Sequence, residues 1–470
     1  MTPLTLPARL TPFLMILLVL FALAMQGCFH SSSGGSTSKL VVPSDRWTWM
    51  SGSDTVAQLG VYGSKGVANA TNVPGARSFT MSRTDGDGDL WLFGGEGLDS
   101  AGSQDLLSDL WRWDGTHWIW VSGSDVINQS GVYGEKGTAA DSNMPGARSR
   151  GVTWTDASGN FWLFGGLGID STGTPGNLND LWRWDGSNWT WVSGSDVVNQ
   201  SGVYGVKGTP AGSNMPGARG AAVSWSDSSG NFWLFGGGGY DSAGDLAPLN
   251  DLWRWDGSEW TWVSGSDVVN QPGVYGIKGM ASGTNMPGAK IASVAWTDAN
   301  GNFWLFGGGG TDNAGTRGLL NDLWRWDGSE WTWVSGSDTV TQFGIYGTKG
   351  IADAANVPGA RELSVSWIDV DGNLWLFGGR GYDSAGTRNL LNDLWRWDGS
   401  NWTWVSGSDV VNQSGSYGTK GTAAADNVPG ARNRFTAWTD TSGNLWLFGG
   451  EGYDNMGNFD ILNDTWRYQP

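Results

Sequence analysis

Histidine and cysteine are nearly absent from this chain. Its 470 residues include two histidines, His30 and His117, and one cysteine, Cys28. A single cysteine cannot form a disulfide within the chain, so cysteine usage says nothing about the redox compartment. Two isolated histidines give no support for a Ser-His-Asp hydrolytic site. We therefore predict no catalytic residues, no cofactor and no metal site.

Basic residues are also scarce. The chain has 27 Lys and Arg against 45 Asp and Glu, which gives a net charge of −18 and a pI near 4.4. Such a surface repels phosphate backbones and anionic lipids, so nucleic acid is excluded as an expected partner. After residue 30 no apolar period of about 3.6 residues is found, which argues against helices. Instead, 34 Trp and 77 Gly form short aromatic segments between turns, and this pattern predicts an all-β chain.

The one long apolar run lies near the start. Arg9 is followed by twelve apolar residues at 13–24, then by Cys28 and a Ser/Gly-rich stretch at 31–38. This order is typical of a secretory signal followed by a flexible tether. An uncleaved membrane anchor is the alternative, but twelve residues are short for a span of roughly 20.

Residues 23–28 resemble the lipobox of bacterial lipoproteins. The resemblance implies a signal peptide at 1–27, a lipidated Cys28 and a tether at 28–45. We therefore predict an extracytoplasmic protein of a bacterial cell envelope, on the outer membrane or the cell surface. It would touch the membrane only through its lipid.

A fixed repeat occupies the rest of the chain. The tetrapeptide Leu-Phe-Gly-Gly occurs six times at a spacing of 71 residues, with its phenylalanine at Phe93, Phe164, Phe235, Phe306, Phe377 and Phe448. Six equal units fill residues 46–470. A repeat of this kind fixes the architecture before any single residue is interpreted.

Each repeat contains four short strand patterns. In the second repeat they lie at 151–154, 161–165, 181–184 and 189–192, with a loop at 168–179 and a link to the next repeat at 194–216. Four antiparallel strands per repeat predict one blade of a β-propeller.

The repeats resemble the kelch family over residues 46–470. The motifs that carry the resemblance are Gly165-Gly166, Asn179-Asp180-Leu181-Trp182 and Pro145-Gly146-Ala147-Arg148, each present in all six copies with small changes. The family implies a six-bladed β-propeller. The period exceeds the family's usual length of about 50, and the long link accounts for the excess.

The two ends of the repeat region complement each other. The region begins with an isolated fourth strand at 47–49 and ends just after a third strand at 466–468. We expect the N-terminal strand to complete the sixth blade, which closes the ring and removes open sheet edges.

Several tempting sites have a structural explanation. Every tryptophan falls in a predicted strand, which favours packing between blades over a sugar platform. The Asp-rich turns, such as Asp85 to Asp89, recur as ordinary hairpin turns and lack the glutamate of a calcium loop. The copper-radical oxidases that resemble this fold need a Cys–Tyr crosslink and histidine ligands, and these are missing here.

Information about a ligand should lie where the repeats differ. One variable place follows Pro-Gly-Ala-Arg and includes Arg150, Glu362 and Arg434. The other lies between the second and third strands and includes Glu96, Tyr240, Arg380, Tyr382, Glu451 and Tyr453. Both connections leave the same end of a blade, so we expect one face to carry both. Neutral drift at exposed positions is an equal alternative.

These observations predict a monomeric, lipid-anchored propeller that binds a protein through its long-loop face without catalysis. A glycan bound by Tyr240, Tyr382, Tyr453 and nearby carboxylates is the second hypothesis. An enzyme acting on a saccharide is the third.

Overall fold

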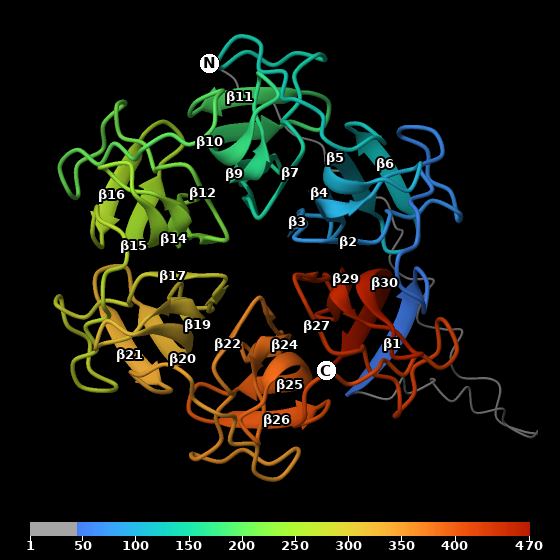
Figure 1. Cartoon of the computed structure of the whole chain (residues 1–470), viewed down its shortest axis with the longest axis vertical. Helices are drawn as coiled ribbons and strands as arrows, with labels where there is room; N and C mark the ends of the chain where they lie inside the picture. Colours follow the sequence, from blue (N-terminus) through green and yellow to red (C-terminus); the bar gives the residue numbers. More distant parts are fainter. Residues whose placement is uncertain (1–44) are drawn as a thin grey trace, which may run out of the picture. The chain divides into compact units, whose positions relative to one another are not determined.

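The computed structural model describes residues 45–470, which form six β-sheets and no helix. Figure 1 shows the sheets arranged around a common axis as the blades of a propeller. Each blade has four antiparallel strands, which confirms the predicted all-β, six-bladed fold. The predicted signal peptide, Cys28 and tether residues 28–44 lie outside the described residues. Within 45–470, the structure has no helix long and apolar enough to cross a membrane.

Strand numbers rise from the axis outward in blades 1 to 5, whereas β1 is the outermost strand of blade 6. The innermost strand of every blade is divided into two segments. Blade 1 contains β2 (Arg77–Ser78), β3 (Met81–Thr84), β4 (Leu90–Leu98), β5 (Gln104–Trp113) and β6 (Trp118–Ser122). Blade 2 contains β7 (Arg148–Ser149), β8 (Val152–Thr155), β9 (Phe161–Ile169), β10 (Pro175–Trp184) and β11 (Trp189–Ser193). Blade 3 contains β12 (Arg219–Gly220), β13 (Val223–Ser226), β14 (Phe232–Tyr240), β15 (Leu246–Trp255) and β16 (Trp260–Ser264).

The other three blades repeat this order. Blade 4 contains β17 (Lys290–Ile291), β18 (Val294–Thr297), β19 (Phe303–Thr311), β20 (Arg317–Trp326) and β21 (Trp331–Ser335). Blade 5 contains β22 (Arg361–Glu362), β23 (Val365–Ile368), β24 (Leu374–Tyr382), β25 (Arg388–Trp397) and β26 (Trp402–Ser406). Blade 6 contains β27 (Arg432–Asn433), β28 (Thr436–Thr439), β29 (Leu445–Tyr453), β30 (Phe459–Gln469) and β1 (Arg46–Ser51).

A ring of six backbone hydrogen bonds explains why each innermost strand is divided. The residue after the first segment has a left-handed φ of 53–60° in every blade, and its N–H donates to the carbonyl of the equivalent residue one blade earlier, at 2.7–3.3 Å. These residues are Phe79, Arg150, Ala221, Ala292, Leu363 and Arg434. The left-handed conformation costs on the order of 1–2 kcal/mol per residue, and the ring of hydrogen bonds offsets that cost.

The double glycine of each repeat marks a bulge where two blades approach closely. Between β4 and β5 the register shifts from Phe93 to Gly95, and Gly94 and Gly95 have φ values of 56° and 103°. A Cβ on Gly94 would lie 2.6 Å from the carbonyl oxygen of Arg148 in the next blade. Glycine is therefore required by both backbone conformation and space.

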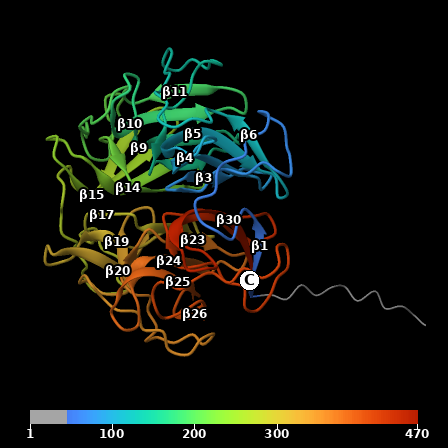
Figure 2. The ribbon, with the colours of Figure 1, turned by 45° about the vertical axis from the view of Figure 1, so that its right-hand side comes forward.

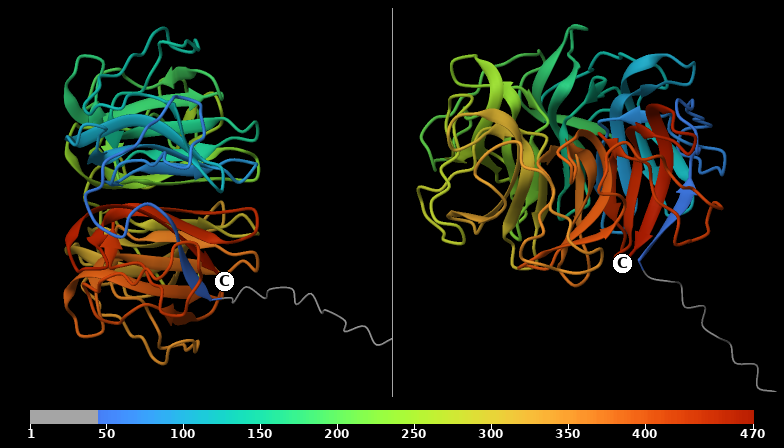
Figure 3. Two further views of the ribbon diagram at one scale, coloured as in Figure 1. Left: turned by 90° about the vertical axis from the view of Figure 1, so that its right-hand side faces the viewer. Right: turned by 60° about the horizontal axis from the view of Figure 1, so that its bottom comes forward.

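The N-terminal strand completes the sixth blade, as predicted. β1 pairs antiparallel with β30, with Trp47 opposite Tyr468 and Trp49 opposite Trp466. Figures 2 and 3 show β1 beside β30 from other directions. Trp47 is 1% exposed and contacts the ring of Phe377 in blade 5, with the ring centroids 5.3 Å apart. The seam is therefore packed like the other blade interfaces.

The hydrophobic core lies between neighbouring blades. Between blades 2 and 3 it includes Trp154, Phe164, Phe232 and Trp260, and the rings of Trp154 and Phe232 are stacked. All 34 tryptophans lie in residues 45–470, and every one is buried or half-buried. This confirms the predicted packing role of the tryptophans, each of which buries on the order of 150–250 Å².

A buried polar network repeats in every blade. In blade 3, Arg219 donates two hydrogen bonds to Asp251 at 2.6 and 2.8 Å, and Tyr204 and the Trp253 indole donate to the same carboxylate at 2.7 Å. In blade 4, Lys290 replaces the arginine and donates to both oxygens of Asp322. The buried cation after Pro-Gly-Ala therefore holds the network aspartate in every blade.

The predicted loop at 168–179 is wrong. β9 extends to Ile169 and β10 begins at Pro175, with Leu167 opposite Asn177 and Gly168 opposite Gly176. The glycines and asparagine that suggested a loop are held by the antiparallel ladder instead. Residues that end a strand pattern in sequence can therefore continue the strand where a neighbouring strand offers hydrogen bonds.

The long link before each inner strand covers the outer edge of the blade that follows. In the link before β12, the Lys207 ammonium donates to the Gly265 carbonyl at 2.7 Å and lies 4.2 Å from the Trp262 ring centroid. Ala211 forms a β-bridge with Trp260 in the outermost strand. This covering layer accounts for the long repeat and protects the outer sheet edge.

Candidate functional site

Strand register brings the two variable places of each blade side by side. Ser78 pairs with Glu96, Ser149 with Leu167, Gly220 with Gly238, Ile291 with Gly309, Glu362 with Arg380 and Asn433 with Glu451. All six pairs lie at the end of the blades where the long links arrive. This end is called the long-loop face, and the opposite end the short-turn face.

Residues of the backbone ring surround one opening of the central channel. A hollow of 150 Å³ on the long-loop face is lined by Phe79, Arg150, Ala221, Ala292, Leu363, Arg434 and their neighbours. We call this opening the mouth. Because the backbone is the same in all six blades, its chemical character depends on side chains.

One side of the mouth carries a charged cluster around an aromatic ring. Phe79 lies between two guanidinium groups, with Arg150 at 4.2 Å and Arg434 at 4.9 Å from the ring centroid. Arg150 pairs with Glu96 at 3.1 Å, and Arg434 pairs with Glu451. The two arginine side chains are 35% and 31% exposed. The cluster therefore joins blades 6, 1 and 2 and offers charges of both signs to solvent.

A second set of charges lies on blade 5. The Glu362 side chain is 13% exposed and pairs with Arg388 at 3.3 Å and with Arg380 at 3.9 Å. A Cβ on Gly309 of blade 4 would lie 2.8 Å from the Glu362 carboxylate. Glycine in blade 4 thus leaves room for the glutamate of blade 5.

The remaining side of the mouth is small and uncharged. Ala221 and Ala292 occupy the ring positions of blades 3 and 4, and Gly238 and Gly309 occupy the paired positions on the second strands. The mouth is therefore asymmetric although the backbone around it is sixfold repeated. An asymmetric surface of this kind can orient a ligand.

The three predicted tyrosines do not come together. Tyr240, Tyr382 and Tyr453 are the last residues of β14, β24 and β29, so they sit at strand ends in three blades rather than in loops. All three are half-buried. Tyr382 packs near Phe343, and Tyr453 packs near Phe459. Within residues 45–470, no aromatic contact joins two of these tyrosines.

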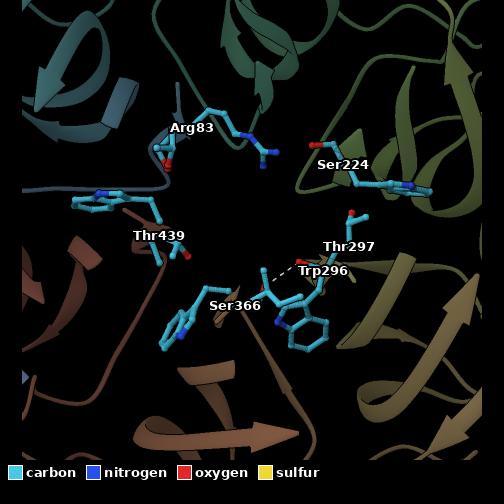
Figure 4. Close-up of a pocket in the computed structure, with 14 residues that line it drawn as sticks. Arg83, Ser224, Trp296, Thr297, Ser366 and Thr439 are labelled. Carbon is cyan, nitrogen blue, oxygen red and sulfur yellow. Dashed lines mark hydrogen bonds between the residues drawn. The ribbon is translucent and has the colours of Figure 1, made fainter. Parts of the chain in front are cut away.

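The channel continues from the mouth toward the short-turn face and contains one unexpected cation. A cavity of 330 Å³ is lined by the inner strands of blades 1, 3, 4, 5 and 6. Figure 4 shows Arg83 extending from β3 into this space toward Ser224, with Thr297 and Thr439 on other walls of the cavity. The Arg83 side chain is exposed to the space inside the channel. The channel walls displace bulk water around it, and this desolvation lowers the pKa of Arg83 from its ordinary value.

Arg83 was missed by the sequence analysis, although the repeat itself contains the signal. The equivalent residues of the other blades are Trp154, Trp225, Trp296, Trp367 and Trp438. All five indoles are buried against a neighbouring strand or blade. Treating all strand tryptophans as one packing class passed over the sixth position, where a charge breaks the repeat.

Potential metal ligands do not gather in the part of the chain that the structure describes. Within 45–470, no three side chains of His, Cys, Asp or Glu form a group that could hold a metal ion. His117 lies in the turn between β5 and β6. The hairpin aspartates cap their own turns: in blade 3 Asp227 accepts hydrogen bonds from the Trp233 indole, the Asn231 side chain and two backbone amides. That the chain acts without catalysis stays a prediction.

Comparisons with known proteins find the chain similar to other structures but to no family. No family model matches the chain, and no curated protein sequence matches it. The kelch resemblance therefore stays a prediction.

Three solved structures are among those similar to it. The structure of YjhT has 13% identity and a TM-score of 0.49, covering 86% of this chain and 95% of that one. A fungal alcohol oxidase of the AA5 family in complex with copper has 15% identity and a TM-score of 0.44, covering 87% and 77%. A protein of unknown function from Dyadobacter fermentans has 10% identity and a TM-score of 0.44, covering 88% and 98%.

Proposed function

We propose that this chain is a non-catalytic binding module that contacts a protein partner through the mouth on its long-loop face. The observation that carries the proposal is the position of the variable residues. Side chains that differ between the otherwise repeated blades line this one opening or pair across strands beside it. Positions that only maintain the blades are the same in every repeat, so the differences are free to serve recognition.

The charges at the mouth suit a protein surface. Arg150 with Glu96, and Arg434 with Glu451, form partly exposed pairs of fixed geometry on both sides of Phe79. Opposite charges in fixed positions select a partner by electrostatic complementarity. The alanine and glycine side of the mouth permits close approach of a partner's backbone or side chain. A glycan platform lacks comparable support, because the three tyrosines lie in separate blades.

Exchange of charges within the pairs tests this proposal. In the double variants Arg150→Glu with Glu96→Arg, and Arg434→Glu with Glu451→Arg, each ion pair can still form while its orientation is reversed. We expect unfolding free energies within about 1 kcal/mol of wild type, because partly exposed pairs contribute little to stability. We expect affinity for a partner identified by capture from the native envelope to fall roughly tenfold or more.

A matched control is available on the short-turn face. Asp87 and Asp371 are exposed, and neither carboxylate accepts a hydrogen bond from a described residue. Their replacement by lysine alters surface charge without touching the mouth. Partner affinity that falls with the lysine variants and is unaffected by the exchanged pairs would place the binding face elsewhere.

The proposed location of the module depends on Cys28. We propose that a lipid on Cys28 holds the protein at the cell envelope, on the basis of the lipobox resemblance. Cys28→Ser should move the protein from the detergent-soluble membrane fraction to the soluble fraction. Unchanged membrane association would point to an uncleaved N-terminal anchor.

A further inference from the structure

Arg83 breaks a packing rule that the other five blades keep. At its position each of the other blades has a buried tryptophan; Trp225, for example, stacks on Trp233 and on Phe303. The stacking partner of blade 1, Trp91, is left half-buried, whereas the equivalent Trp233 is 7% exposed. Blade 1 therefore loses apolar burial to carry this arginine. A position that breaks a local rule without structural gain is expected at a functional site.

The Arg83 guanidinium has no partner in the described structure. None of the ion pairs among residues 45–470 includes it, and no carboxylate lines the 330 Å³ cavity into which it extends. The repeated carboxylates on the hairpins of the short-turn face are engaged by indole and backbone N–H groups. Arg83 is exposed to the channel with no carboxylate beside it, so its N–H donors are free to bind an anion that enters the channel.

The walls of the cavity indicate what kind of anion would fit. The hydroxyl groups of Ser224, Thr297 and Thr439 line the space, and none of them is hydrogen-bonded to another described residue. Edges of Trp225 and Trp296 supply apolar surface. The volume is at the lower end of the range for small-molecule sites, roughly 300–1,000 Å³. Guanidinium pairs bidentately with a carboxylate, and hydroxyls donate to its remaining lone pairs.

We propose that the central channel binds a small organic carboxylate, with its charged end on Arg83 and its apolar part against the tryptophan edges. This site lies between the inner strands, beyond the mouth, and involves none of the residues proposed to contact a protein partner. It would give the propeller a second binding activity whose success or failure is independent of the first.

Calorimetric titration of the full-length protein in low-chloride buffer tests the proposal. Benzoate is the first probe, benzamide is its neutral analogue of nearly equal shape, and acetate and chloride test for charge without apolar area. We expect saturable benzoate binding and at least tenfold weaker binding of the other three. Arg83→Gln should weaken benzoate binding at least tenfold. The control variant is Arg183→Gln, which should leave benzoate binding unchanged. Arg183 lies on the third strand of blade 2 and stacks on Trp162.

Two further measurements keep the outcome decisive. Arg83→Trp restores the repeat, so it should raise the melting temperature and abolish benzoate binding together. Benzoate should change the tryptophan fluorescence and raise the melting temperature of the wild-type protein, and should do neither for the two Arg83 variants. The proposal is overturned by no saturable benzoate binding up to about 10 mM. It is equally overturned if benzamide or chloride binds as well as benzoate, or if Arg83→Gln leaves benzoate affinity unchanged.

Discussion

Raising the pH should unfold this propeller through its buried tyrosines. Six tyrosines, one in each polar network, donate a hydrogen bond to the network aspartate: Tyr62, Tyr133, Tyr204, Tyr275, Tyr346 and Tyr417. Burial, followed by the charge of the adjacent aspartate, raises the pKa of each phenol well above its ordinary value. The unfolded chain loses these protons near the ordinary value of about 10, while the folded chain keeps them.

The sign and size of the effect follow from this difference. A pKa raised in the folded state contributes stability that is fully present below the unfolded pKa. That stability is lost as the pH rises toward the folded pKa. Each tyrosine removes about 1.4 kcal/mol per pH unit above roughly pH 10, so six remove about 8 kcal/mol per unit. A domain with an ordinary stability of about 5–15 kcal/mol cannot withstand two such units.

Tyr204→Phe isolates the contribution of one network. At neutral pH it should lower the unfolding free energy by about 1.5–3 kcal/mol, because a hydrogen bond to the charged Asp251 is lost. Above pH 10 its stability should fall less steeply than that of wild type, by about 1.4 kcal/mol per pH unit. The two curves should therefore meet roughly one to two units above pH 10.

Urea unfolding followed by tryptophan fluorescence, repeated from about pH 7 to pH 11.5, measures both curves. Tyrosinate absorbance recorded in parallel shows whether the buried phenols ionise only as the chain unfolds. Parallel stability curves for wild type and Tyr204→Phe above pH 10 would refute the reasoning. Such curves would mean that the Tyr204 phenol ionises alike in both states.

Three further predictions concern single features of the ring. Lys290→Arg should stabilise the fold by about 1–3 kcal/mol in urea unfolding, because arginine in the other blades also donates to two glycine carbonyls; a variant no more stable than wild type contradicts this. Deletion of Arg46–Ser51 removes the buried Trp47, so it should lower the unfolding free energy by at least about 3 kcal/mol and cause aggregation. An unchanged melting temperature would show that the seam is not where the structure places it. Asp227→Ala should cost about 1–3 kcal/mol because the Trp233 indole loses its acceptor, and equal stability would mean that the turn holds without its cap.

The repeat made the architecture predictable from the sequence. Six copies of Leu-Phe-Gly-Gly at one constant spacing fix the number of blades, and the isolated Trp47 and Trp49 pattern fixes how the ring closes. Both signals are clear in the sequence because a residue that every blade needs recurs in each of the six blades. The pairing of variable places, such as Glu362 with Arg380, also follows from antiparallel strand order.

Other parts of the site could not be predicted because they depend on neighbouring blades. The ion-pair partners of Arg150 and Arg434 are Glu96 and Glu451, which the sequence assigned only to loops. The stacking of both guanidinium groups on Phe79 requires the closed ring. The strand at Gly168 exists because of its ladder partner rather than its own propensity. Arg83 was visible in the repeat, but its direction into the channel was not.

The backbone ring at the mouth keeps its conformation whichever residue occupies each of its positions, so the side chains there can change without changing the backbone. Its left-handed positions hold Phe, Arg, Ala and Leu with nearly the same φ, so conformation there is dictated by the hydrogen-bonded circle and not by residue type. A substitution at one such position changes what the opening presents while the other five keep their places. Proteins built on this repeat can thus acquire new ligand preferences one blade at a time, with each step tolerated by an unchanged scaffold.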